Sequence, residues 1–231
     1  MLRMDGVSKN YNHRAKAVVG ISGANFEIAK GDYVAVVGPS GSGKSTLLLM
    51  LGGMLSPTEG RVYLDGQSLY DLTPDRRAAV RRASIGFVFQ TFNLVPYLTA
   101  AENVQIPLFL AGRGEAAQRD HATRLLERVG LGDRLDHKPS ELSVGQQQRV
   151  ALARVLANDP AVILADEPTG NLDPETGRQV IDFFDELNKE GRTIVIVTHD
   201  PRAAERAKTT LRLVEGTVLN GQAESGRAAH A

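Results

Sequence analysis

Residues 38–45 of this chain of 231 residues fit the pattern G-x-x-x-x-G-K-S/T and read Gly38-Pro39-Ser40-Gly41-Ser42-Gly43-Lys44-Ser45. The apolar, β-branched run Tyr33 to Val37 precedes them, and the apolar stretch Leu47 to Leu55 follows. Glycines allow consecutive backbone N–H groups to curve around phosphate oxygens, and the start of a following helix adds positive charge. The segment therefore predicts a phosphate-binding loop between a strand and a helix.

The side chains at the end of this loop predict binding of a nucleoside triphosphate with Mg²⁺. Lys44, which directly follows Gly43, is expected to bridge the β- and γ-phosphates. Ser45 is expected to offer its hydroxyl to Mg²⁺, and Thr46 a further hydroxyl to a phosphate oxygen.

Two further apolar runs, Thr193 to Val197 and Ala161 to Leu164, resemble Tyr33 to Val37 and predict buried strands of a mostly parallel sheet. Helical spacing of apolar residues alternates with these runs. It is seen at Ala122, Leu125, Leu126 and Val129, and again at Val180, Phe183, Phe184 and Leu187. Alternating strands and helices indicate an α/β protein.

Two acids follow the run Ala161 to Leu164, at the carboxyl end of a predicted strand, where ligands of such sheets bind. Asp166 is expected to hold Mg²⁺ through its water shell, and Glu167 to polarise the water that attacks the γ-phosphate. Adjacent residues on a strand face opposite ways, so both acids serve one site only if the chain turns there. Pro168 favours that turn.

The overall charge gives no reason to expect a nucleic-acid partner. Lys plus Arg total 27 and Asp plus Glu total 27, so the chain has no bulk positive field.

The composition also bears on the cellular location. With no cysteine, the chain forms no disulfide and no thiolate metal site, as is typical of proteins in the cytosol. Its apolar stretches are shorter than the roughly 20 residues that span a bilayer. Met1 to Asp5 show no secretory signal, and we expect a cytoplasmic protein.

A second motif narrows the class, because phosphate loops occur in many unrelated ATPases and GTPases. Leu142-Ser143-Val144-Gly145-Gln146 resembles the signature of the ABC family, with Val144 where that motif usually has glycine. Ser143 is expected to cap a helix, so that its hydroxyl, the Gly145 amide and the helix dipole face an anion. In the ABC family that anion is the γ-phosphate held by the opposite subunit.

Further matches follow in the order that is typical of the family. Gln90, after Ile85 to Phe89, resembles the residue of the loop that senses Mg²⁺ and contacts the membrane subunit. Asp173, in Asn171-Leu172-Asp173, resembles the acid that crosses the interface between subunits. His199 resembles the switch histidine that touches the γ-phosphate, and Tyr11 matches the aromatic position that stacks on adenine.

The resemblance covers Met1 to about Leu219 and implies the fold of ABC ATPases, which belong to the P-loop NTPases. That fold has a mostly parallel core sheet, an N-terminal antiparallel β subdomain and an inserted α-helical subdomain. We expect one ABC ATPase domain over residues 1–231. Residues 1–90 and 160–219 form the nucleotide-binding core with the β subdomain, residues 91–159 form the helical subdomain, and residues 220–231 form a tail.

The resemblance also implies a function. Two copies are expected to clamp two Mg-ATP molecules and to hydrolyse them, powering export or translocation of lipoproteins, drugs or peptides by separate transmembrane subunits. Gln146 to Val150 and Leu164 to Asp173 are similar to the branch of bacterial lipoprotein-releasing and macrolide-exporting ATPases. The expected partners are a transmembrane permease and a second copy, and the expected location is peripheral, on the cytoplasmic side of the inner membrane.

Two alternatives stay open at this point. An ABC ATPase of DNA repair or translation uses the same motor, but repair members usually carry a long coiled-coil insertion and ribosomal ones two cassettes. Neither feature is present. A module that closes on ATP without turnover is suggested by Val144 alone, and the presence of Glu167 and His199 argues against it.

Overall fold

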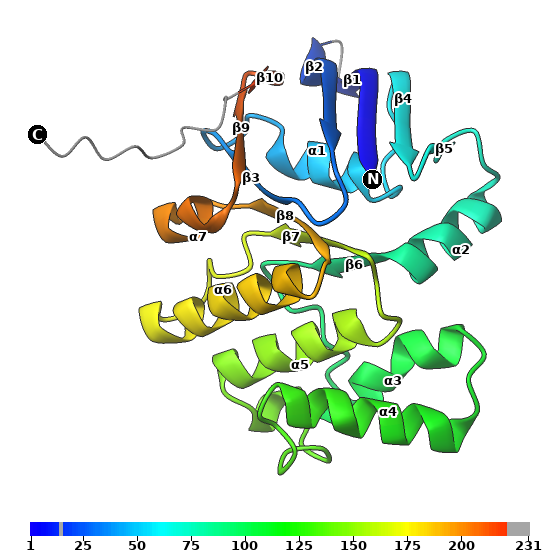
Figure 1. Ribbon diagram of the computed structural model, residues 1–231, viewed down its shortest axis with the longest axis vertical. Helices are drawn as coiled ribbons and strands as arrows, with labels where there is room; N and C mark the ends of the chain where they lie inside the picture. Colours follow the sequence, from blue (N-terminus) through cyan, green and yellow to red (C-terminus); the bar gives the residue numbers. More distant parts are fainter. Residues whose placement is uncertain (14–15, 221–231) are drawn as a thin grey trace, which may run out of the picture.

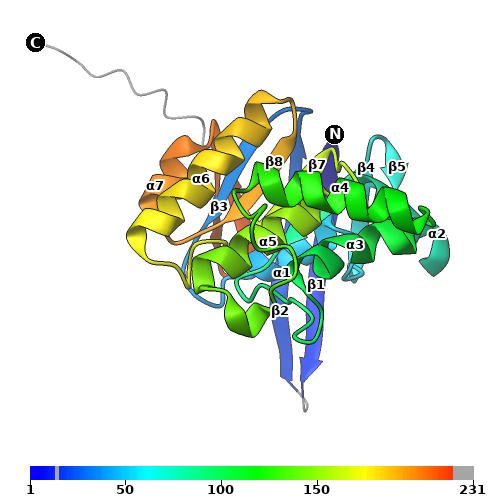
Figure 2. The same ribbon diagram turned by 90° about the horizontal axis from the view of Figure 1, so that it is seen from below.

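The structure, a computed structural model, describes residues 1–13 and 16–220 (Figure 1). A four-stranded sheet at the N-terminal end has the order β2-β1-β4-β5, and its neighbouring strands are antiparallel. Its strands are β1 (Leu2–His13), β2 (Lys16–Ile28), β4 (Glu59–Leu64) and β5 (Gln67–Ser68). The β1–β2 hairpin projects from the rest of the molecule (Figure 2). The antiparallel sheet expected at the N-terminus is confirmed.

A six-stranded sheet with the order β10-β9-β3-β8-β7-β6 forms the core. Four neighbouring pairs are parallel, and only β9 and β10 pair in antiparallel fashion. The strands are β3 (Tyr33–Val37), β6 (Ile85–Val88), β7 (Val162–Asp166), β8 (Thr193–Val197), β9 (Thr209–Val214) and β10 (Thr217–Asn220). This arrangement confirms the predicted α/β class with a mostly parallel core sheet.

Three predicted boundaries were wrong by one or two residues. The strand expected at Ala161 to Leu164 is β7, which starts at Val162 and continues through Asp166. Pairing of Asp166 with Val197 of β8 extends it. Asn220, expected in the tail, is the last residue of β10. The rest of the predicted tail, residues 221–231, lies outside the described residues.

Side chains along the central strands alternate between two hydrophobic clusters, one on each face of the core sheet. On β3, Val34 and Val36 pack toward α1 and the N-terminal sheet, whereas Tyr33 and Ala35 pack toward the helices of the other face. Strand β8 repeats the alternation. Because both faces are covered, these strands are apolar throughout, and the period of two is invisible in their sequence.

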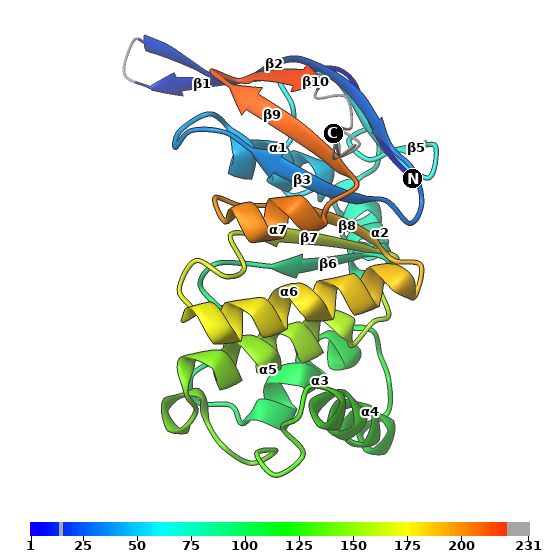
Figure 3. The same ribbon diagram turned by 60° about the vertical axis from the view of Figure 1, so that its left-hand side comes forward.

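The helices are distributed over these two faces. Helix α1 lies between the two sheets, while α6 and α5 cover the other face of the core sheet, and α3 and α4 lie beyond α5 (Figure 3). Their bounds are α1 (Lys44–Leu51), α2 (Pro74–Ser84), α3 (Ala100–Leu110), α4 (Glu115–Arg128), η1 (Pro139–Glu141), α5 (Val144–Leu156), α6 (Pro174–Lys189) and α7 (Pro201–Arg206). No helix within residues 1–13 and 16–220 has the length and apolar content to cross a membrane.

Candidate functional site

The loop between β3 and α1 is packed so closely against neighbouring backbone that two of its positions accept only glycine. A Cβ atom at Gly38 would overlap the carbonyl oxygen of Leu213, and one at Gly43 would overlap the carbonyl oxygen of Gly20. Gly43 also has a φ of 102°, a value that other residues rarely adopt. The glycine pattern thus reflects the position of the loop against β9 and β2.

Helix α1 begins at Lys44 without a side-chain cap on its N-terminus and without an acid in its first turn. The first N–H groups of α1 therefore have no acceptor from a capping side chain. They favour binding of an anion at the start of the helix. Lys44 is buried, with 7% of its surface exposed. Its Nζ donates to the carbonyl oxygens of Gly38 and Pro39 at 2.9 and 3.0 Å, so the ammonium stays within the loop.

In front of the loop is a cavity of about 310 Å³. It is lined by Ser40, Gly41, Gly43, Lys44, Ser45, Thr46, Gln90, Asp166, Glu167, Val197 and His199. Four strands that are neighbours in the core sheet, β3, β8, β7 and β6, end at this cavity. The sheet order thus brings together residues that lie far apart in the sequence, and ten of the eleven lining residues were predicted site residues.

The chain turns sharply between the two acids at the end of β7. Asp166 is the last residue of the strand, and Glu167 has a φ of 48°, in the left-handed region. The Glu167 N–H donates to the carbonyl of Val197 at 2.9 Å, which holds the turn against β8. Both carboxylates consequently line one cavity, as the prediction required.

Glu167 contacts the residue expected to act as a switch. Its Oε1 lies 3.0 Å from Nε2 of His199, and the His199 N–H donates to its Oε2 at 3.2 Å. Burial raises the pKa of Glu167, although the contacts with His199 and the charge of Lys44 act in the opposite direction. Its side chain is 17% exposed. A carboxylate with a raised pKa, partly shielded from water, is suited to accept a proton.

Asp166 supplies the feature that fits a divalent cation. Its Oδ1 is buried and has no hydrogen-bond partner among the described residues. Buried carboxylate oxygens without a partner are costly unless a cation or ordered water satisfies them. The hydroxyl of Ser45 and the amide of Gln90 line the same cavity, so the available donors are the oxygen ligands that Mg²⁺ prefers.

The signature residues do not line this cavity. Ser143 caps α5: its Oγ accepts from the Gln146 N–H at 3.3 Å, and the Gln146 side chain accepts from the Ser143 N–H at 2.9 Å. A Cβ at Gly145 would lie 2.7 Å from Cγ2 of Thr176, so the starts of α5 and α6 are in contact.

Asp173, which also lies outside the cavity, caps the start of α6 beside them. Its Oδ1 accepts from the N–H groups of Glu175 and Thr176 at 3.1 and 3.0 Å. Hydrogen bonding to Thr176 lowers the pKa of Asp173, which keeps this carboxylate charged at the start of the helix. Ser143, Gly145 and Asp173 therefore form a second group of predicted site residues, at the paired starts of α5 and α6.

Tyr11 lies beside α1, the helix that follows the phosphate loop, and does not line the cavity. Its hydroxyl is 3.1 Å from Oγ1 of Thr46, and its ring lies against Gly20. The Lys9 ammonium is 5.5 Å from the ring centroid. Tyr11 is 37% exposed, so part of its surface is accessible beside the phosphate loop.

Sequence reasoning missed two residues that hold this region together. Gln148 is fully buried and its Nε2 donates to the carbonyl of Pro168 at 2.9 Å, joining α5 to the turn that follows Glu167. The Asn171 amide donates to the carbonyl of Gln90 at 3.0 Å. Gln148 follows two other glutamines, and only the helical phase of the apolar residues Ala151 and Leu152, three and four positions later, could have indicated that it faces inward.

The fold and the cavity define a nucleoside triphosphatase with a phosphate loop. Residues 21–170 match the family model described as ABC transporter. The chain belongs to this family and is one of its ATP-binding, ATP-hydrolysing components.

Individual relatives agree with this assignment. An uncharacterized ABC transporter ATP-binding protein of Thermotoga maritima is 47% identical over 218 residues, which are 94% of this chain and 93% of that protein. A macrolide export ATP-binding/permease protein MacB of Syntrophobacter fumaroxidans is 48% identical over 229 residues, 98% of this chain but only 32% of that protein. The chain thus spans about a third of the length of this MacB relative. None of these names supports the repair or translation alternative.

A solved structure shows the same fold. The ATP-binding cassette MJ0796, in a dimeric post-hydrolysis state with ADP and Pi, is 42% identical. It superposes with a TM-score of 0.91 and covers 98% of this chain and 100% of that one.

Proposed function

We propose that this chain is the motor of a bacterial exporter, which uses ATP hydrolysis to drive translocation of a lipoprotein, drug or peptide by membrane-spanning subunits. The observation that carries the proposal is the single cavity at which the phosphate loop meets Gln90, Glu167 and His199. The identity of 48% to a protein named for macrolide export supports the export branch.

In this proposal the loop binds the triphosphate. Backbone N–H groups of residues 40–44 and of the start of α1 donate hydrogen bonds to the phosphate oxygens. Lys44 exchanges its two carbonyl acceptors for the β- and γ-phosphates, since a charged acceptor binds an ammonium more strongly than a neutral one. Thr46 adds a hydroxyl, and the ring of Tyr11, which is partly exposed, stacks on the adenine ring.

Asp166, Ser45 and Gln90 are the residues that would hold Mg²⁺. The ion, when bound, neutralises charge on the phosphates. Glu167 accepts the proton of the attacking water, because its raised pKa makes it a stronger base than an exposed carboxylate. His199 orients that carboxylate through two contacts. Its proposed second role is to touch the γ-phosphate.

A second copy completes each site. Ser143, Gly145, Gln146 and Asp173 do not line the cavity of their own chain. In the proposed dimer, Ser143 and the Gly145 amide of one chain face the γ-phosphate held by the other, and Asp173 crosses the interface. The dimeric state named for the MJ0796 cassette supports this arrangement.

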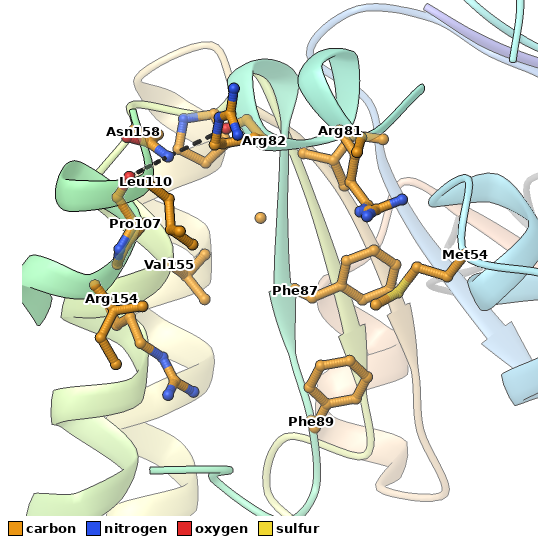
Figure 4. A pocket seen from close by; sticks show the side chains of 15 residues that line it. Met54, Arg81, Arg82, Phe87, Phe89, Pro107, Leu110, Arg154, Val155 and Asn158 are labelled. Atoms are coloured by element: carbon orange, nitrogen blue, oxygen red, sulfur yellow. Dashed lines mark hydrogen bonds between the residues drawn. The ribbon is translucent and has the colours of Figure 1, made fainter. Parts of the chain in front are cut away.

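A groove of this chain, lined by Phe89 beside Gln90, is the proposed binding site for the membrane subunit. A cavity of about 480 Å³ lies between α3 and α5 on one side and α2 and β6 on the other (Figure 4). Its apolar lining includes Met54, Phe87, Phe89, Pro107 and Leu110, and its charged lining is Arg81, Arg82 and Arg154. Since no carboxylate lines it, we propose as occupant an apolar segment of the membrane subunit that carries an acidic residue. The chain then lies on the cytoplasmic face of the inner membrane.

The test is the steady-state ATPase rate per chain as a function of protein concentration. The proposal expects a rate that rises with concentration, because each site needs a second copy. It also expects Glu167→Gln and Ser143→Ala to lower kcat by about 10² or more, with ATP still bound by Glu167→Gln. Ser140→Ala, an exposed serine near by, is the matched control and keeps the native rate. A rate that is independent of concentration and unchanged in Ser143→Ala would contradict the shared site.

A further inference from the structure

Arg154, in the last turn of α5, is bonded to a segment some sixty positions earlier in the chain. Its Nη1 donates to the carbonyl of Asn93 at 2.6 Å and its Nη2 to the carbonyl of Phe92 at 2.7 Å. Both bonds come from one planar guanidinium, and charge-assisted bonds of this kind are about twice as strong as neutral ones. They fix the backbone two and three residues after Gln90.

The same short segment is held from its other end. The Asn171 amide donates to the carbonyl of Gln90, and Leu94 packs against the hydrophobic cluster of the helical face. Asn93 has a φ of 50°, in the left-handed region, where an asparagine is tolerated but not favoured. The backbone between Gln90 and Leu94 is therefore held in one conformation by contacts from outside it.

The charge of Arg154 has no counterion within residues 1–13 and 16–220. The guanidinium is half-buried, and burial lowers its pKa. A partly desolvated charge without an ionic partner is costly unless dipoles satisfy it. Here the two carbonyls and the C-terminal end of α5 provide those dipoles. A simple packing role would be filled at lower cost by an apolar residue.

Helix α5 connects this contact to the second group of predicted site residues. Arg154 and the Ser143 cap are at opposite ends of the helix. They are about 16 Å apart along the axis at 1.5 Å per residue. Gln148, between them, is bonded to the carbonyl of Pro168 beside Glu167. The position of the Gln90 loop and that of the Ser143 end are thus linked through one rigid element.

We propose that Arg154 is a positioning residue for ATP hydrolysis: by holding the backbone at Phe92 and Asn93, it keeps the Gln90 side chain at the cavity of the phosphate loop. The inference rests on the proposed function, in which Gln90 helps to hold Mg²⁺. Arg154 itself touches no reacting atom, and its effect passes through Gln90.

A double-mutant cycle on the full chain tests this inference. Arg154→Met is expected to lower kcat about tenfold, to leave the KM for ATP within about twofold, and to raise the Mg²⁺ concentration for half-maximal activity about threefold. In a Gln90→Ala background, Arg154→Met is expected to change kcat by less than about twofold, because the side chain that it positions is gone. Arg124→Met, an exposed arginine on α4, is the control and leaves all three quantities unchanged.

The outcomes separate this inference from the proposed function. If Gln90→Ala slows turnover and Arg154→Met slows it further by the full tenfold, Arg154 acts independently and the inference is overturned. If Gln90→Ala leaves turnover and its Mg²⁺ dependence unchanged, the proposed role of Gln90 fails, and the inference fails with it. Thermal unfolding of each variant identifies folding defects. If Arg154→Met does not fold, Arg154→Lys, which keeps the charge but loses the planar pair of bonds, carries the same cycle.

Discussion

At the scale of the residue, the turn between Asp166 and Glu167 determines the chemistry of the cavity. A strand that continued through Glu167 would direct the two carboxylates to opposite faces of the sheet. The left-handed φ of Glu167 instead brings both to one cavity, beside Lys44 and His199. Local strain of this kind, of order 1–3 kcal/mol, is found where the surrounding structure enforces it, often at functional sites.

Replacing Glu167 by glutamine should stabilise the fold while removing activity. Burial raises the pKa of Glu167, so folding favours its protonated form. The stability that this carboxyl group contributes is present at pH values below its ordinary pKa and is lost as the pH rises through the raised one. At pH 7.5, where the buried charge is a penalty, Glu167→Gln is expected to raise the Tm by about 2 °C.

Thermal unfolding of both proteins at neutral and acidic pH checks this prediction. The difference in Tm should disappear when the pH falls below the ordinary pKa of a glutamate, because both side chains are then neutral. A Glu167→Gln variant that is less stable than the native chain at neutral pH would contradict the assignment, since it would mean that the contact with His199 outweighs the cost of burial.

At the scale of the element, the start of α5 serves both the fold and the site. Ser143 caps the helix reciprocally with Gln146, and such caps contribute about 1 kcal/mol. The same hydroxyl is the one proposed to face the γ-phosphate of a second copy. A substitution to alanine removes both contributions together, so it does not separate the stabilising role from the functional one.

Substitution of Ser143 by asparagine or aspartate separates its stabilising role from its functional role, because both residues are as good at the N-cap as serine. We expect Ser143→Asn and Ser143→Asp to unfold within about 2 °C of the native chain. Ser143→Asp should lower kcat at least tenfold more than Ser143→Asn, since a carboxylate repels the γ-phosphate. Tm and kcat measured on both variants provide the check. Equal activities would show that no anion approaches this helix start.

At the scale of the whole molecule, the predicted site residues form two separate groups. One lines the cavity of the phosphate loop, and the other lies at the starts of α5 and α6. Within one chain the second group does not reach the first cavity. If two copies associate so that the second group of one copy meets the cavity of the other, all of the predicted site residues lie at a shared site.

Nucleotide-dependent association should therefore be observable in solution. The Glu167→Gln variant, which is expected to bind ATP without hydrolysing it, should sediment as a dimer with Mg-ATP and as a monomer with Mg-ADP, because only the γ-phosphate bridges the two chains. Adding Ser143→Asp to this variant should abolish the dimer. Sedimentation velocity at several protein concentrations measures both states. A dimer that forms equally well with ADP would argue against a bridging γ-phosphate.

Much of the fold was predictable because its decisive signals are local. The strands Tyr33–Val37 and Thr193–Val197 occupy the residues predicted for them, and Ser143 caps a helix as expected. The error at β7 has a clear origin. The predicted apolar run stops at Leu164 and Asp166 is polar, but pairing with Val197 of β8 keeps Asp166 in the strand. A long-range hydrogen bond of this kind leaves no trace in the local pattern.

The amino-acid sequence alone determined the strand, loop and helix around Lys44 and the ABC family, because glycine spacing and apolar runs act within a few residues and need no partner. The tertiary structure alone decided that Asp166 stays in β7 while Glu167 takes a left-handed φ, that Gln148 joins α5 to Pro168, and that Arg154 holds the backbone after Gln90. These features depend on the order of the strands in the core sheet and on the packing of α5 against β6, which are set by contacts between distant segments.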